Sequence, residues 1–299
     1  MHLCPGGIAP MPVTALLLVL LSGLLHATWN LAAKRAAAGA DFVILYSSLT
    51  CLVYAPAAVW FWPALPAHIG WQGWGLVALS GMLHVVYGLV LQRGYQVADL
   101  SVVYPVARGT GPLLSSLAAV VLLGERVTLA SGAGLVLVVL GILGLSRRDA
   151  RVTSEPAARR RGLLYGLATG VCIALYTVVD ATSVRVVRMP PLLLDYLSNA
   201  TRTLILLPIV VHRGRKLVEA ARSHGRAALV VAVLAPMAYI LVLQAMQTAP
   251  VTRVAPAREV SMLFAVLLGA AVLGERQGLS RLVSAACIAA GVITLSLGR

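Results

Sequence analysis

Residues Ala107–Arg126 read ARGTGPLLSSLAAVVLLGER, and residues Ala257–Arg276, 150 positions later, read AREVSMLFAVLLGAAVLGER. The two stretches are identical at eight of twenty positions, including the opening Ala-Arg pair and the closing Leu-Gly-Glu-Arg. A match of this kind at a fixed distance is typical of an internal duplication. The sequence therefore predicts two structural repeats in one chain.

The composition indicates a membrane protein. Of the 299 residues, 60% are hydrophobic and 11% charged, whereas soluble domains have about 45–50% apolar and about 25% charged residues. Ten apolar stretches reach the roughly 17–25 residues that a helix needs to cross the hydrocarbon core. The predicted spans are 13–33, 42–63, 73–92, 100–123, 128–146, 162–182, 191–211, 226–247, 251–273 and 279–298.

A polar link divides these stretches into two groups of five. It reads RRDARVTSEPAARRR, from Arg147 to Arg161. We expect a first five-helix repeat over 1–148, a basic cytoplasmic linker over 149–161 and a second five-helix repeat over 162–299. Because five is odd, the second repeat enters the bilayer from the opposite side. The predicted fold is an all-α membrane protein with ten transmembrane helices in two inverted five-helix repeats around a central cavity.

The net charge of +14 is explained by membrane topology. The basic residues lie in short links between apolar stretches, without the aromatic or glycine-rich motifs of RNA-binding proteins, so no nucleic-acid partner is expected. Alternate links carry sixteen Lys and Arg on one side and four on the other. The positive-inside bias then predicts a multi-pass protein of the plasma (inner) membrane, with the richer side in the cytoplasm and both termini outside.

The repeated motif resembles that of a known family. Two five-helix copies, each closing its fourth span with Leu-Gly-Glu-Arg, are similar to the EamA-like ten-helix branch of the drug/metabolite transporter superfamily. The sequence His26-Ala27-Thr28-Trp29-Asn30 resembles the first helix of that branch, and the resemblance extends from Leu16 to Leu297. It implies a basket of helices that moves small metabolites or drug-like solutes, often out of the cell.

Two arginines inside the apolar stretches are symmetry mates. Arg108 and Arg258 each lie shortly after a proline, Pro105 or Pro256, that leaves a backbone carbonyl without its usual donor. A charge at the centre of a membrane helix costs roughly 2.5–3.5 kcal/mol even on lenient scales. Either the two guanidinium groups bind an anionic or carboxylate-bearing solute, or each holds its own bent helix to nearby carbonyls or carboxylates.

Three further charged residues are candidates for the transport site. Glu259 corresponds to Gly109 in the first repeat, so the duplication does not account for it. It is a candidate proton-coupling group, or else one half of a static ion pair with Arg108 or Arg202. Asp195 and Arg202 are seven residues apart on one helical face, which suits a cavity wall or a structural network.

Aromatic and amide side chains in mid-span complete the predicted solute-binding set. They are expected to shape the cavity, although a single Tyr in a span is also compatible with ordinary packing around one satisfied hydroxyl. These residues are Trp29, Asn30, Tyr87, Tyr176 and Tyr239.

The acidic residues of the repeated motif are expected at the membrane surface. Glu125 lies beside Arg126, and Glu275 lies beside Arg276. They are interpreted either as solvated helix ends or as latches that join loops when one face closes. Small residues in 128–146 and 279–298 suit close packing within the bundle or a homodimer through the fifth and tenth helices.

Motifs of other chemistry are not found. The sequence has no P-loop, dinucleotide fingerprint, His-Glu-x-x-His or Gly-x-Ser-x-Gly, and its four cysteines lack metal-ligand spacing. We therefore expect no enzyme activity, no cofactor and no metal. The sequence favours a secondary transporter that works by alternating access, with efflux coupled to a proton or solute gradient. The alternatives are a lipid or lipid-linked-sugar flippase, a non-transporting membrane scaffold and an intramembrane enzyme.

Overall fold

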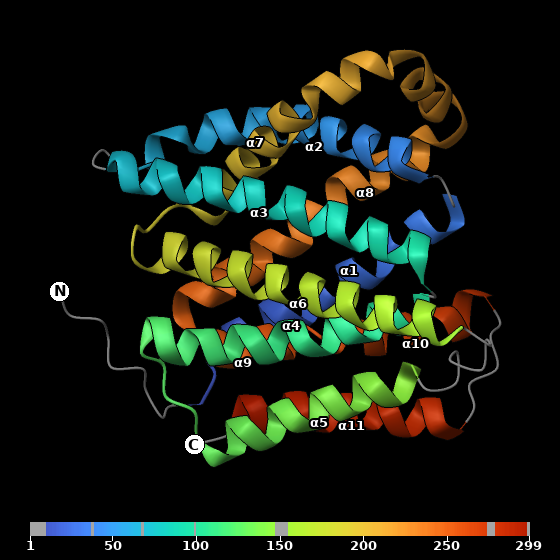
Figure 1. Cartoon of the computed structure of the whole chain (residues 1–299). Coiled ribbons are helices and arrows are strands. Elements are labelled where there is room, and N and C mark those ends of the chain that lie inside the picture. Colours follow the sequence, from blue (N-terminus) through green and yellow to red (C-terminus); the bar gives the residue numbers. More distant parts are fainter. Residues whose placement is uncertain are drawn as a thin grey trace.

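A computed structural model of the chain describes residues 10–36, 39–66, 69–98, 100–146, 155–273 and 279–297. Within these ranges the regular structure is helical, with no strand (Figure 1). The helices of the first half are α1 Val13–Ala36, α2 Gly39–Phe61, η1 Trp62–Ala64, α3 Gly70–Val97, α4 Leu100–Leu123 and α5 Leu129–Ser146. Those of the second half are α6 Pro156–Arg185, α7 Pro191–His212, α8 Gly214–Thr248, α9 Val251–Ala257, α10 Val260–Leu273 and α11 Leu279–Leu297.

Most of these helices coincide with the predicted spans, and the ninth does not. The prediction of one helix over 251–273 is wrong, because the chain breaks between α9 and α10 at Arg258 and Glu259. Pro256 has no backbone N–H, and the Glu259 N–H donates to the Pro256 carbonyl at 3.0 Å in a tightened turn. The equivalent helix α4 continues through Pro105 and Pro112. In addition, α6 begins at Pro156, inside the predicted linker 149–161.

Six of the described helices are both long and apolar enough to cross a membrane. Among the described residues, α1, α2, α3, α4, α6 and α8 meet both criteria, and apolar α5 and α11 are shorter. The charged α7 and the broken pair α9–α10 bring the described spans to ten, five in each half. The chain is therefore a multi-pass membrane protein.

Helix packing relates the two halves by a pseudo-twofold axis. The contact of α3 with α6 is matched by that of α8 with α1, and α2 with α8 is matched by α7 with α3. Likewise α4 packs on α6 as α10 packs on α1. The self-matching pair, α5 and α11, lies together at the bottom of Figure 1. Each half therefore completes the other, as inverted repeats do.

Glycines allow α5 and α11 to touch through their backbones. A Cβ atom added at Gly134 would lie 2.9 Å from the Gly291 carbonyl oxygen, and one at Gly291 would lie 2.7 Å from the Gly134 oxygen. The small residues that suggested a homodimer thus pack against each other within one chain. The homodimer itself stays a prediction.

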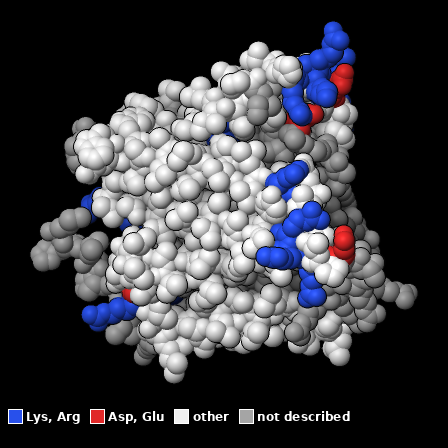
Figure 2. Space-filling view, in the orientation of Figure 1, with Lys and Arg blue, Asp and Glu red and all other residues white. Residues whose placement is uncertain are grey.

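The bundle has two ends of different charge. We call one the Glu125 end, where Met11, Glu125 and Arg185 lie, and the other the Arg159 end. The Met11 N–H donates to the Ser296 carbonyl at 3.1 Å, so α1 begins where α11 finishes, at the Glu125 end. Basic side chains gather at the opposite edge, on the right of Figure 2. By the helix bounds, the described basic residues at this edge are Arg93, Arg159, Arg160, Arg161, Arg213, Arg215, Lys216, Arg222 and Arg226, against Arg126, Arg185, Arg188 and Arg253 at the Glu125 end.

Candidate functional site

A buried ion pair joins the two repeats. Arg108 projects from α4, and its Nη2 lies 2.8 Å from Oε2 of Glu259, in the break between α9 and α10. The two side chains are only 10% and 3% exposed. Arg108 Nη2 also donates to Ser261 Oγ at 3.0 Å. Arg108 therefore contacts a carboxylate of the other repeat, which is the ion pair with Glu259 that the sequence analysis offered as one alternative.

Arg258 precedes Glu259 in the chain but makes different contacts. Its Nη2 donates to the Tyr176 hydroxyl at 3.5 Å, and its guanidinium carbon lies 5.8 Å from the centre of the Tyr239 ring. Within the described part of the chain, no ion pair is found for Arg258. The two symmetry-related arginines thus differ, since Arg108 is neutralised by a carboxylate and Arg258 is held by aromatic groups.

Aromatic side chains from three helices lie together beside Arg258, which contacts two of them, Tyr176 and Tyr239. We call His84, Tyr87, Tyr176 and Tyr239 the tyrosine cluster. His84 stacks on Tyr176 with ring centres 4.2 Å apart, while Tyr87 and Tyr239 present their edges to the same ring at 5.8 and 6.3 Å. The three predicted tyrosines therefore lie together, although they come from α3, α6 and α8.

Two members of this region are absent from the predicted site. The Tyr239 hydroxyl donates to Asp180 Oδ2 at 2.5 Å, and Asp180 is 1% exposed. Asp180 stands four residues after Tyr176, and His84 three residues before Tyr87, so both share a helical face with a predicted residue. That spacing is the signal by which the sequence could have included them.

A strip of polar side chains, Asp195, Asn199 and Arg202, runs along α7. Asp195 and Arg202 do not pair directly, because Asn199 stands between them. Asn199 Nδ2 donates to Asp195 Oδ2 at 3.1 Å, and Asn199 Oδ1 accepts a hydrogen bond from Arg202 Nη2. Arg202 also donates to Ser47 Oγ of α2 at 3.2 Å. This strip is a bridged network between α7 and α2.

Two serines connect the strip on α7 to the tyrosine cluster. Ser198 Oγ donates to Ser80 Oγ at 3.1 Å, and His84 Nδ1 lies 2.9 Å from the Ser80 carbonyl oxygen. Both serines are buried. Ser198 and Ser80 therefore join α7 to α3, and the stacking of His84 on Tyr176 joins α3 to α6.

Trp29 and Asn30 of α1 take part in other contacts. Asn30 Nδ2 donates to the His26 carbonyl of its own helix at 2.7 Å. Trp29 packs edge-on against His26, with ring centres 4.8 Å apart, and against a small apolar cluster that includes Phe42 and Tyr46. Their role in solute binding stays a prediction.

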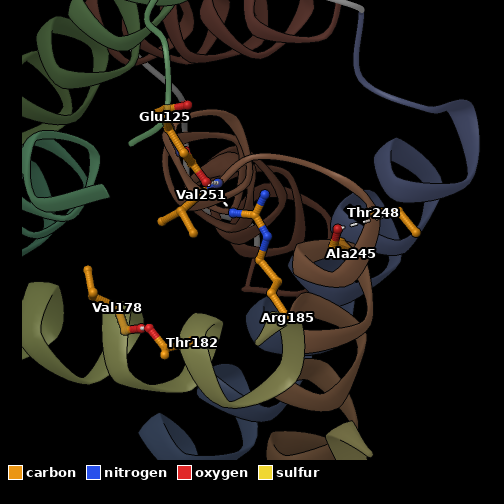
Figure 3. Close-up of polar contacts among 8 residues, drawn as sticks. Glu125, Val178, Thr182, Arg185, Ala245, Thr248 and Val251 are labelled. Atoms are coloured by element: carbon orange, nitrogen blue, oxygen red, sulfur yellow. Dashed lines mark hydrogen bonds and ion pairs between the residues drawn. The ribbon is translucent and has the colours of Figure 1, made fainter. Parts of the chain in front are cut away.

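Glu125 is buried, which corrects the expectation of a solvated helix end. It is 4% exposed and forms an ion pair with Arg185 (Figure 3). Its Oε1 accepts the Val251 N–H at 2.8 Å and its Oε2 accepts the Thr252 N–H at 2.9 Å. Glu275 and Arg276, the counterparts in the second repeat, lie outside the described residues.

Two cavities are found toward the ends of the bundle. One of about 450 Å³ is lined by residues that include Phe61, Arg188 and Gln244. The other, of about 850 Å³, is lined by residues that include Ala32 and Arg222. Neither is lined by the buried ion pair or by the tyrosine cluster, so both groups of residues are packed away from these openings.

Comparison with known proteins places the chain in a family. The sequence model of the EamA-like transporter family matches residues 13–147 and 160–297. A solved crystal structure is similar with a TM-score of 0.75 over 95% of this chain and 97% of its own, at 18% identity, which shows a shared fold. No curated protein was found to match. The chain therefore belongs to the EamA-like transporter family, whose members are membrane transporters of small solutes.

Proposed function

We propose that the protein is a secondary transporter that exports a small solute bearing an anionic or carboxylate group across the inner membrane by alternating access. The observation that carries the proposal is that two symmetry-related arginines make different contacts. Arg108 has a carboxylate partner in Glu259, and Arg258 contacts a hydroxyl and an aromatic ring. The proposal is one of transport rather than catalysis, as the family membership favours.

Arg258 is the group that would bind the solute. Removing a cation from water costs several kcal/mol even after relaxation of the protein. A cation–π contact returns only about 0.5–2 kcal/mol of this, and the bond to Tyr176 is long at 3.5 Å. A carboxylate or other anionic group of a solute would give Arg258 a direct ion pair, since Glu259 contacts Arg108, and would accept two parallel hydrogen bonds from the guanidinium.

Glu259 is the group that would couple transport to a proton gradient. A proton on Glu259 removes its attraction for Arg108 and frees that guanidinium for an anionic solute. Loss of the proton restores the ion pair and favours release of the solute. The first repeat has Gly109 at the equivalent position. The exchange of partners is therefore proposed to occur at one carboxylate, between the repeats that move relative to each other.

The proposed orientation of the protein in the membrane rests on the charge distribution. Nine described Lys and Arg residues lie at the Arg159 end and four at the Glu125 end. By the positive-inside bias we place the Arg159 end in the cytoplasm and both chain termini outside. Because the proton and the solute bind together in this scheme, export would carry both from the Arg159 end to the Glu125 end, driven by the outward gradient of the solute.

The coupling role is tested in proteoliposomes with the Glu259→Gln variant. A carboxylate-bearing solute would first be selected by thermal shift, and its flux measured with and without a pH gradient. We expect the variant to lose flux driven by the pH gradient and to retain exchange of solute against solute. Glu219→Gln, at an exposed position of α8, is the matched control. Undiminished pH-driven flux in Glu259→Gln would remove Glu259 from the mechanism.

The binding role is tested with Arg258→Gln. We expect the affinity for the selected solute to fall at least tenfold, since loss of a charge-assisted hydrogen bond costs about 1.5–3 kcal/mol. Arg93→Gln removes an exposed guanidinium from the Arg159 end and serves as the control. Equal affinity of the Arg258 and Arg93 variants would show that the solute binds elsewhere.

A further inference from the structure

The end of α4 has a conformation that fixes Glu125. Gly124 has a φ of +66°, a left-handed conformation that glycine adopts without strain, and the Glu125 N–H donates to the Ala119 carbonyl at 3.2 Å. A left-handed glycine directly after the last turn, with the next N–H bonded back to a carbonyl of that turn, terminates the helix. The backbone of α4 therefore turns back at this point, and Glu125 is held in a defined position.

Glu125 caps a helix that belongs to the other repeat. The first N–H groups of any α-helix lack partners in their own helix. In α9 these groups belong to Val251 and Thr252, which are 0% and 3% exposed, and the preceding Pro250 makes no side-chain cap. Both carboxylate oxygens of Glu125 are used, one for each N–H group, and Arg185 of α6 adds an ion pair (Figure 3).

The capped helix is short and connects two sites. α9 has seven residues, all buried, and is followed at once by Arg258 and Glu259. At 1.5 Å per residue, about 12 Å separates Val251 from Glu259. α4 thus holds the α9 segment at both ends, through Glu125 at its start and through Arg108 at the break that follows it.

A break separates α9 from α10. The Ser261 and Met262 N–H groups donate to the carbonyls three residues earlier, at 3.2 and 2.9 Å, so a regular α-helix is interrupted between α9 and α10. The corresponding part of α4 runs on without interruption. We call α9, together with the break that follows it, the lever. Among the described residues it occurs in the second repeat, and the corresponding part of the first repeat is one continuous helix.

We propose that Glu125 is a positioning residue that holds the Glu125 end closed, as a lock, by capping α9. Through α9, this cap is coupled to the Arg108–Glu259 ion pair, so that opening of the pair weakens the cap. In the conformation described, both ends of the α9 segment are held by α4. When the Arg108–Glu259 contact opens, the α9 segment loses its polar contact with α4 at the break, and release of the Glu125 cap then allows the Glu125 end to separate. This inference rests on the proposed alternating access and adds the residues that link the ion pair to one face.

Hydrogen exchange of the Val251 and Thr252 amides tests the lock without any solute. In protein reconstituted into nanodiscs, we expect Glu125→Gln to speed exchange in the peptide covering 249–257 at least tenfold, because glutamine offers one acceptor oxygen and no charge. Arg185→Gln keeps both backbone bonds and should give a smaller increase. Glu219→Gln is the control and should give none.

The link to the ion pair is tested by the same measurement on Glu259→Gln. Faster exchange at residues 249–257 in this variant, at least threefold, supports the lever. Unchanged exchange there, with an increase in Glu125→Gln, would show a static cap and overturn the proposal. Unchanged exchange in Glu125→Gln would overturn the lock itself. Because no solute flux is involved, failure of the transport proposal would appear separately, in the proteoliposome experiment.

Discussion

Removal of Arg108 is the sharpest test of the buried pair. Its guanidinium is 2.8 Å from Glu259, and the two side chains are 10% and 3% exposed. Two unit charges about 4 Å apart interact by about 4 kcal/mol at an effective dielectric constant of 20. Removing one partner of a buried pair typically costs about 3–5 kcal/mol. Because Arg258 adjoins Glu259 and recovers part of this energy, we expect Arg108→Gln to lower the free energy of unfolding by about 3 kcal/mol.

A double-mutant cycle separates the pair from the rest of each side chain. Reversible unfolding in mixed micelles would be followed by tryptophan fluorescence for Arg108→Gln, Glu259→Gln and the double variant. We expect a coupling energy of about 2–3 kcal/mol, within the range for residues in contact. The exposed pair Arg213–Asp41, with side chains 42% and 29% exposed, should give about 0–1 kcal/mol. Additivity within about 0.5 kcal/mol at Arg108 and Glu259 would refute the reasoning.

Two further predictions concern packing and orientation. Gly291→Ala should destabilise the protein by about 1–3 kcal/mol, because its Cβ would lie 2.7 Å from a carbonyl oxygen of α5, whereas Gly88→Ala meets nothing within 4 Å and should not destabilise. Equal losses of stability in the two variants, measured by unfolding in mixed micelles, would contradict the α5–α11 contact. In intact cells, a membrane-impermeant maleimide should label a cysteine placed at Arg188 and leave one at Arg159 unlabelled, in a chain freed of its own cysteines. The opposite pattern would reverse the proposed orientation.

The positions of the spans were accessible from the sequence because each one has to satisfy the bilayer by itself. A helix in hydrocarbon needs a minimum length of apolar residues and bonds its own backbone, so a local window contains the required information. The fourth predicted span, 100–123, coincides with α4. The inverted arrangement followed from the repeated Leu-Gly-Glu-Arg and from the odd number of spans in each half.

Errors arose where the environment of a residue is supplied by a distant segment. A window around 251–273 reads as one apolar helix, since the break depends on how Arg258 and Glu259 turn toward different neighbours. Glu125 looks solvated beside Arg126, yet it is buried by the backbone of a helix 126 residues later. The sequence gives no measure of such distances in space.

The candidate site shows the same division. Arg108, Arg258 and Glu259 were identifiable one by one, because a charge in an apolar span is costly and needs a reason. Their pairing was not, and two partners for Glu259 remained open until Arg108 was found at 2.8 Å. Asp180 and His84 were left out of the predicted set for the same reason, since their value lies in contacts with Tyr239 and Tyr176.

Ten membrane crossings in two related halves can be predicted from the amino-acid order alone, because hydrophobic length and internal repetition are properties of a linear string. The folded arrangement was needed to show which charges meet, that α9 is a separate short helix, and that a carboxylate of one half caps a helix of the other. Those features depend on the packing of segments more than a hundred residues apart. Electrostatic and hydrogen-bond energies change over a few ångströms, a scale that only the folded arrangement specifies.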